Sequence, residues 1–109
     1  MAGAAREAAH RAGDRRREAI ASNNLGIALR KAGRVAEAVE AHGKALHIHE
    51  EFDDWYGVGQ ALHNLARTHE TARRPDDVRA CLLRAADAFT RANAPTEAAQ
   101  SRAWAAELG

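Results

Sequence analysis

Residues 20–32, IASNNLGIALRKA, and residues 60–72, QALHNLARTHETA, decide the fold of this chain. Both stretches place an asparagine before a leucine and a small residue, as Asn24-Leu25-Gly26 and as Asn64-Leu65-Ala66, 40 positions apart. The same offset pairs Ala21 with Ala61, Ala32 with Ala72, Arg34 with Arg74, Ala45 with Ala85 and Asp14 with Asp54. Similarity at one fixed offset of this size predicts stacked repeats that share a core.

Composition and punctuation predict that each repeat is helical. Alanine, the best helix former, supplies 28 of the 109 residues, and only 5% are aromatic. Gly33 suits the positive φ that follows a helix, and Pro75 and Pro95 suit first helical turns. Asp14 and Asp54 are expected N-caps. We therefore predict an all-α chain of about six helices, joined by short connections and packed antiparallel. The expected ranges are 2–12, 15–32, 35–51, 55–72, 75–92 and 95–108.

Charge and hydropathy exclude several functional classes. With 16 basic and 15 acidic residues, the chain has no general attraction to nucleic acid or to a membrane surface. No apolar run approaches the roughly 20 residues that span a bilayer, and no signal peptide is visible, so we expect a cytoplasmic protein. The single Cys81 cannot form an internal disulfide and is expected to be a buried, inert thiol.

The repeats resemble tetratricopeptide repeats (TPRs). The Leu-Gly or Leu-Ala pair of that family's first helix stands at 25–26 and 65–66, and its Gly-x-Tyr-x-Glu-Ala turn stands at 33–38, with Val35 in place of the tyrosine. The second turn, at 73–78, matches more loosely. The 40-residue period resembles that of the TPR subgroup found in kinesin light chains and bacterial regulators, and residues 61–66 resemble the signature of that subgroup, Ala-Leu-x-Asn-Leu-Ala. The resemblance implies a right-handed superhelical solenoid of antiparallel helical hairpins.

The resemblance implies a single TPR domain over residues 1–109, which consists of several repeat units. Residues 1–14 resemble a partial repeat, 15–54 and 55–94 are full repeats, and 95–108 resemble a capping helix. The N-terminal end lacks such closure, so we expect either truncation from a larger protein or self-association through that end. The closing stretch is similar to the ends of TPR tracts in actinobacterial regulators and signalling ATPases.

Small residues mark the expected helix contacts. Gly26, Ala38, Ala45 and Ala66 stand where neighbouring helices of the repeat meet. A larger side chain at such a joint forces the helices apart and typically costs about 1–3 kcal/mol.

In TPR proteins, the face of each first helix that points away from the second helix lines a concave groove. By this resemblance, twelve residues are expected to line a groove for a peptide or a protein segment. They are Ile20, Asn23, Asn24, Ile27, Arg30 and Lys31 in the first unit, Gln60, His63, Asn64, Arg67 and Glu70 in the second, and Gln100 in the third.

Asn24 and Asn64 are the leading candidates in this groove. An amide side chain offers two donors and an acceptor, which suits the backbone of an extended peptide. The alternative is that each amide bridges two helices of the solenoid. Arg30, Lys31 and Arg67 suit acidic side chains or a C-terminal carboxylate, or form a solvated charged face.

Catalysis, cofactors and metals are not expected. The sequence has no nucleophile–base motif and no Gly-rich phosphate loop. His42, His47 and His49 do not share one helical face, as a metal site on this helix would require. His42 and His69 occupy packing positions, so we interpret these two as core or half-buried histidines. The basic run Arg15-Arg16-Arg17 is interpreted as a solvated face, since no aromatic residues accompany it as in a nucleic-acid site.

These observations predict a protein-interaction module that binds a peptide or protein segment in the groove and belongs to a bacterial regulatory or signalling protein. The alternative is a structural scaffold that forms homo-oligomers through uncapped ends of the solenoid. No direct binding to nucleic acid or to a membrane is expected.

Overall fold

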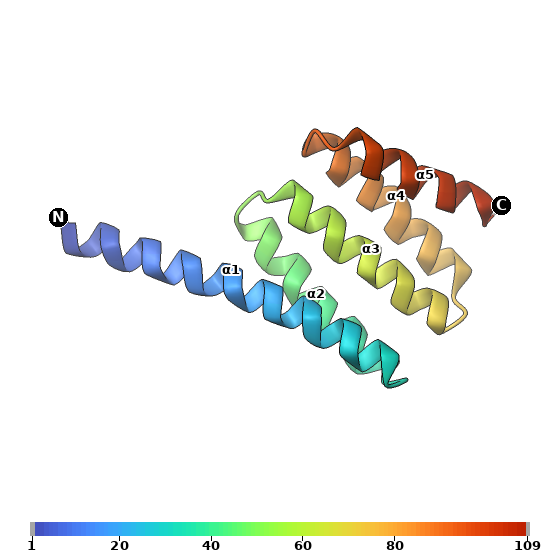
Figure 1. The fold of residues 1–109 in the computed structure, drawn as a ribbon, viewed down its shortest axis with the longest axis horizontal. Coiled ribbons are helices and arrows are strands. Elements are labelled where there is room, and N and C mark those ends of the chain that lie inside the picture. Colours follow the sequence, from blue (N-terminus) through green and yellow to red (C-terminus); the bar gives the residue numbers. More distant parts are fainter. Residues whose placement is uncertain (1, 109) are drawn as a thin grey trace.

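A computed structural model describes residues 2–108, so Met1 and Gly109 of the predicted domain lie outside the described residues. Five helices make up this described part: α1 (Ala2–Lys31), α2 (Val35–Glu51), α3 (Trp55–Thr71), α4 (Pro75–Arg91) and α5 (Pro95–Glu107). Each helix packs antiparallel to the one before it, in chain order, and the molecule measures 55 × 32 × 16 Å (Figure 1). The predicted all-α repeat solenoid is confirmed.

The described residues form five helices where about six were expected, because the predicted helices 2–12 and 15–32 are one helix, α1. Asp14 does not cap a helix. Its carboxylate instead pairs with Arg17 and lies 3.2 Å from His10 Nε2, both within α1. These pairs are three and four residues apart and stabilise the helix on both sides of Gly13. Residues 3–11 are all exposed and have no neighbouring helix whose packing would favour a turn at Gly13.

The four connections share one geometry. Residues 32–34, 52–54, 72–74 and 92–94 each link two helices, and the middle residue has a positive φ. Gly33 at 79° confirms the prediction, and Asp53, Arg73 and Asn93 adopt 50°, 58° and 59°. The third residue donates its N–H back across the helix end, as from Arg34 to the Leu29 carbonyl at 2.9 Å. This Schellman-type bond ends each helix at the same step.

The helix starts follow the predicted chemistry in three places. Pro75 and Pro95 are the first residues of α4 and α5, where a missing N–H loses no helical bond. Asp54 caps α3, since its Oδ1 accepts a 3.0 Å hydrogen bond from the Gly57 N–H. Short turns and fixed helix starts give the hairpins a common frame.

Apolar clusters centre on the second hairpin, α3–α4. The larger cluster contains Leu46 of α2 and the buried faces of α3, α4 and α5, namely Val58, Ala61, Leu62, Leu65, Ala85, Ala88, Phe89 and Ala98. A second cluster joins Ala66, Val78, Leu82 and Ala105, with Trp104 and Leu108 packed against it. Burial raises the pKa of the half-buried Cys81 thiol, which favours its protonated, unreactive form.

The predicted small residues lie at close helix contacts. Ala38, Ala45 and Ala66 have no exposed surface. A Cβ added to Gly26 of α1 would lie 2.5 Å from the His42 ring of α2. In the same way, a Cβ added to Gly59 of α3 would lie 2.7 Å from the Phe89 ring of α4. Glycine at these two positions lets the helices approach until an aromatic ring contacts the backbone.

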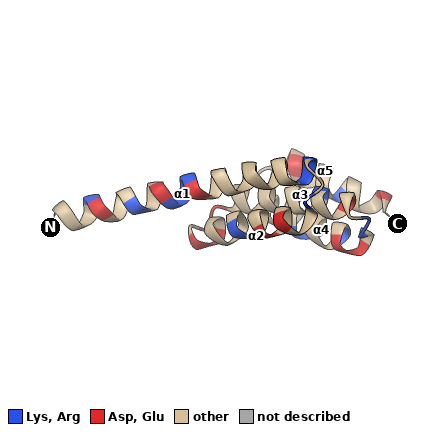
Figure 2. Ribbon diagram, turned by 90° about the horizontal axis from the view of Figure 1, so that it is seen from below, with Lys and Arg blue, Asp and Glu red and all other residues tan. Residues whose placement is uncertain are grey.

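The middle of α1 is attached to the connection between α2 and α3. The Arg16 guanidinium stacks over the Phe52 ring, 4.7 Å from its centroid, and Arg15 pairs with Glu51 at 2.6 Å. N-terminal to these contacts, α1 extends away from the other helices (Figure 2). None of the described helices combines the length and the apolar character needed to cross a bilayer.

Candidate functional site

A cleft lies between α1 and α3, the first helices of the two hairpins. Its volume is about 370 Å³, and α1 and α3 run parallel because α2 connects them as an antiparallel neighbour (Figure 1). The lining residues are Ile20, Asn23, Asn24 and Ile27 from α1, Gln60, His63 and Asn64 from α3, and His49 from α2. Seven of the twelve predicted groove residues therefore face this α1–α3 cleft.

The other five predicted residues lie outside the lining. Arg30 and Lys31 form the last turn of α1, and Arg67 and Glu70 follow Asn64 toward the end of α3. Because the two helices are parallel, these four side chains are at the same end of the cleft. Gln100 is exposed on α5 and does not line it. The walls of the cleft thus carry no carboxylate, lysine or arginine, and three cations and one anion stand at one end.

Asn24 and Asn64 enter the cleft from opposite walls. Asn24 is exposed and Asn64 is half-buried. Within residues 2–108, neither side-chain amide forms a hydrogen bond, although the Asn64 backbone carbonyl accepts one from Thr68 Oγ1 at 3.0 Å. Both amides therefore have donors and acceptors available to a ligand.

Asn23, by contrast, is bound to the interior of the hairpin. Its Oδ1 lies 2.7 Å from Nδ1 of His42, which is fully buried. Because a carbonyl oxygen only accepts, Nδ1 carries the proton and the buried Nε2 has no partner. Burial, aided by the positive charge of Arg30, lowers the pKa of His42 to about 4, so this ring is neutral at pH 7. The predicted core role of His42 is confirmed, and the ring fixes Asn23.

His49 is a cleft residue that the sequence analysis missed. Its side chain is only 12% exposed, and its Nδ1 lies 3.2 Å from Oδ2 of Asp54, the N-cap of α3. The ring packs against Gly57 of α3, where a side chain would collide with it. The 40-residue offset pairs His49 with Ala9, which is exposed, and with Phe89, which is buried, so the repeat gave two conflicting signals for it. The glycine opposite the ring is the one feature that indicates a close contact.

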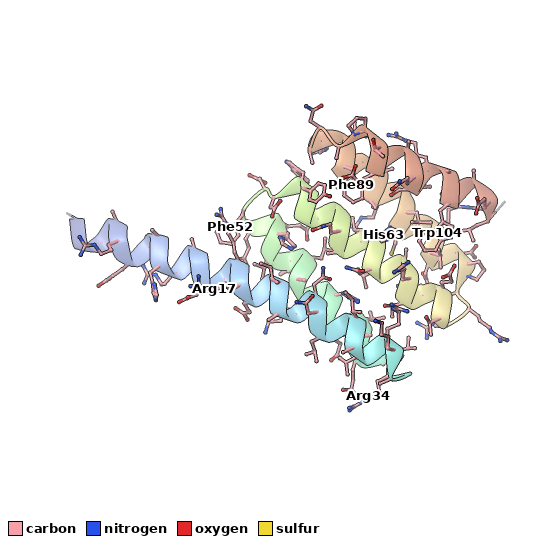
Figure 3. All side chains as sticks on the ribbon, viewed as in Figure 1. Arg17, Arg34, Phe52, His63, Phe89 and Trp104 are labelled. Carbon is pink, nitrogen blue, oxygen red and sulfur yellow. The ribbon has the colours of Figure 1, made fainter. Side chains whose placement is uncertain are left out.

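His63 links the cleft to the last helix. Its ring meets the Trp104 ring of α5 edge to face, with centroids 5.6 Å apart (Figure 3). Burial lowers the pKa of His63, and the nearby charge of Arg67 lowers it further. A neutral imidazole and an indole edge therefore continue the uncharged surface from α3 to α5.

In the described part of the chain, no three histidine, cysteine or acidic side chains gather as a metal site would require. A family model described as Tetratricopeptide repeat matches residues 17–91 of the chain. No curated protein matches it in sequence.

Proposed function

This chain belongs to the tetratricopeptide-repeat family, and we propose that it binds an extended segment of another protein in the α1–α3 cleft. A TPR domain is a protein-interaction module and is generally not catalytic. The observation that carries the proposal is the pair of free amides, Asn24 and Asn64, which stand at equivalent repeat positions on facing walls.

The two amides suit the backbone of the ligand. An extended peptide exposes N–H and C=O groups along both edges, and these groups need partners whatever the side chains are. An asparagine on each wall offers donors and an acceptor to both edges. Asn23 does not serve in this way, because His42 already occupies its oxygen.

The surroundings of the amides define the rest of the ligand. Ile20, 57% exposed, and Ile27 offer an apolar contact on the α1 wall. The cations Arg30, Lys31 and Arg67 stand at the end of the cleft toward which α1 and α3 run. We therefore propose a segment with an apolar side chain near Ile20 and Ile27 and with an acidic group, either a side chain or a C-terminal carboxylate, at that end.

The cellular setting proposed here is a bacterial regulatory or signalling protein in the cytoplasm, in the TPR subgroup with a 40-residue period. The 40-residue offset supports the subgroup, and the alanine- and arginine-rich composition supports the bacterial source. A net charge of +1 supports a protein partner over direct binding to nucleic acid or to a membrane.

A self-associating scaffold is the second candidate function. The observation in its favour is Leu25 of α1, which is 55% exposed, whereas its repeat equivalent Leu65 is 8% exposed. An exposed leucine at a position that packing covers elsewhere in the same chain is a candidate contact between copies.

The test begins with random peptides displayed on phage and selected against the protein. The tightest peptide is then titrated into the wild type and into Asn24→Ala, Asn64→Ala and the double variant by calorimetry. Loss of one neutral hydrogen bond, worth about 0.5–1.5 kcal/mol, weakens binding about two- to tenfold, and the double variant should lose more than either single one.

Asn93→Gly is the matched control, since it removes an asparagine in the α4–α5 connection at a position whose φ of 59° glycine accepts. It should bind like the wild type. An unchanged affinity of the double variant would reject the α1–α3 cleft as the binding site.

A further inference from the structure

Among the described residues, 2–108, no second helix packs against the N-terminal third of α1. Residues 3–11 are exposed throughout, and this segment leaves the solenoid beyond the contacts of Arg15 and Arg16 (Figures 1 and 2). An isolated alanine-rich helix of this length is only marginally stable in water, and tertiary contacts normally stabilise it.

The same helix has an uncovered face further along. Between the two hairpins, α2 packs on α3, and Val58, Ala61 and Leu65 of α3 are 4%, 0% and 8% exposed. Their equivalents 40 positions earlier are Glu18, Ala21 and Leu25. The Glu18 side chain is 38% exposed, Ala21 is exposed and Leu25 is 55% exposed. Within residues 2–108, the face of α1 that corresponds to the α2-covered face of α3 is therefore largely exposed, although Lys44 of α2 reaches Glu18.

Residues 3–12 are the equivalents of the α2 residues that cover α3. Gly3 and Ala5 stand 40 positions before Gly43 and Ala45. Arg6 stands in the same way before Leu46, which shares an apolar cluster with Val58. The equivalents of that apolar pair are therefore Arg6 and Glu18, which carry opposite charges. A contact between residues 3–12 and this face would therefore replace the apolar pair by an ion pair.

Within one molecule this contact is blocked, because α1 continues straight through Gly13. The pairs of Asp14 with Arg17 and His10 stabilise the straight form. We propose that two copies of the chain instead pair through antiparallel α1 helices that cross near Gly13, so that residues 3–12 of each lie along residues 14–23 of the other, cover Glu18 and Ala21, and end within one turn of Leu25. This inference gives the second candidate function a definite interface.

The register follows from the repeat. In the α2–α3 hairpin, the turn at residue 53 sets residue 46 opposite residue 60. Antiparallel α1 helices that cross at residue 13 set Arg6 opposite residue 20 of the partner, within one turn of Glu18 of the partner subunit. The contact is self-complementary and closes as a two-fold dimer.

Two other cations already surround Glu18. Arg15 Nη1 lies 2.9 Å and Lys44 Nζ 2.8 Å from its carboxylate, and Arg15 is shared with Glu51. Arg6 of the partner subunit would join this partly exposed network as a further cation, so we expect the charge pair to direct the register and Leu25 to supply most of the affinity.

Pairing through Glu18 and Leu25 uses the side of α1 opposite the α1–α3 cleft. At 100° per residue, Glu18 and Leu25 lie about 180–200° around α1 from Ile27, which lines the cleft. A dimer would therefore present two clefts at once, so a partner with two copies of the recognised segment would bind with avidity.

The test is the mass of the whole chain in solution, measured by sedimentation over a dilution series. The wild type should be a dimer that dissociates on dilution, and Leu25→Glu should be a monomer at every concentration of the series. Leu83→Glu is the matched control, because Leu83 is 49% exposed on α4, outside the proposed interface, and this variant should dimerise like the wild type.

The charge pair tests the register. Arg6→Glu should weaken dimerisation about fivefold or more, and Arg6→Glu combined with Glu18→Arg should restore at least part of this loss. Ala5→Glu should also weaken dimerisation, because its equivalent Ala45 is fully buried, whereas Ala4→Glu should not, because its equivalent Lys44 is exposed.

Three results would overturn the proposal. The first is a wild type that stays monomeric across the series, and the second is a dimer that survives both Leu25→Glu and Arg6→Glu. The third is protection of residues 5–12 from hydrogen exchange that does not depend on concentration, since this would show the segment folded back in its own molecule. Circular dichroism confirms that each variant is folded. The Leu25→Glu variant should bind the selected peptide with unchanged affinity. The test of the dimer is then independent of the test of peptide binding in the α1–α3 cleft.

Discussion

The two hairpins share a frame but differ in what fills them. The α3–α4 hairpin encloses Leu62 and Leu82, which are 1% and 0% exposed. At the equivalent positions, 40 residues earlier, the α1–α2 hairpin encloses Ser22 and His42, 8% and 0% exposed. One hairpin thus has an apolar interior, and the other is built around a buried histidine hydrogen-bonded to Asn23.

This difference shows which features define the repeat. The common features are the three-residue connections and the small residues at the helix contacts, and they hold the backbone whether the interior is leucine or histidine. The polar interior gives less hydrophobic stabilisation, but it fixes a side chain on the wall of the cleft. We expect the second hairpin to carry most of the stability and the first to be sensitive to pH.

The largest expected effect is at the repeat position that is leucine in both hairpins, as Leu25 and as Leu65. Leu65→Ala removes a buried side chain from the larger apolar cluster and should lower the free energy of unfolding by about 2–4 kcal/mol. Leu25→Ala, the matched change in the first hairpin, should cost less than about 1 kcal/mol, because Leu25 is mostly exposed. Urea titration of monomeric protein measures both, and equal losses would contradict the difference between the hairpins.

The second prediction concerns pH. An unfolded histidine takes up a proton near pH 6.5, whereas His42 in the folded protein stays neutral down to about 4. The unfolded state therefore binds more protons in this window, so stability falls as pH is lowered from about 6.5 toward 4. Between pH 7 and pH 5 the loss from His42 should be about 2 kcal/mol.

His42→Phe provides the comparison for this effect, because phenylalanine keeps an aromatic ring at this position and does not titrate. Urea titrations at the two pH values should show a smaller loss for this variant. The remaining loss is expected from His63, whose pKa is also lowered by burial. A pH dependence identical to that of the wild type would show that His42 is not the titrating group.

The third prediction isolates the hydrogen bond between the cleft wall and the interior. Asn23→Ala leaves the buried His42 ring without its partner and should cost about 1–2 kcal/mol of stability. In the His42→Phe background the same change should cost much less. Equal costs in the two backgrounds would mean that the stability effect of Asn23 does not depend on His42.

The smallest expected effect is in the connections. Arg73 has a φ of 58°, a conformation that glycine adopts freely and an arginine does not. Arg73→Gly should therefore raise stability by about 0.5–1 kcal/mol, whereas Gly33→Ala should lower it at the equivalent step between α1 and α2. Thermal unfolding measures both changes, and a destabilised Arg73→Gly would mean that the Arg73 side chain makes a stabilising contact.

Repetition made most of the frame predictable. The 40-residue offset located the hairpins, and Gly33, Pro75, Pro95 and Asp54 marked helix ends with the local chemistry they need. The same register selected seven residues that line the α1–α3 cleft, because a helix places residues three and four apart on one face.

The remaining features depend on contacts between distant segments. Gly13 and Asp14 have the chemistry of a turn, but no helix lies beside residues 3–11 to favour one, so α1 continues. The place of His49 in the cleft follows from the absence of a side chain at Gly57, and the bond from His42 to Asn23 follows from how closely α2 approaches Gly26. Neither the contact of His49 with Gly57 nor the hydrogen bond of His42 with Asn23 has an equivalent at the 40-residue offset, where the paired residues are Phe89 with Glu97 and Leu82 with His63.

The most direct test of the central claim, that the α1–α3 cleft binds a peptide backbone through Asn24 and Asn64, is a titration of ¹⁵N-labelled protein with the selected peptide, followed by NMR. The side-chain amide signals of Asn24 and Asn64 should shift together with those of Gln60, whereas Asn93, outside the cleft, should not move. Shifts confined to the outer faces of α2 and α4, with the Asn24 and Asn64 signals unchanged, would contradict the claim.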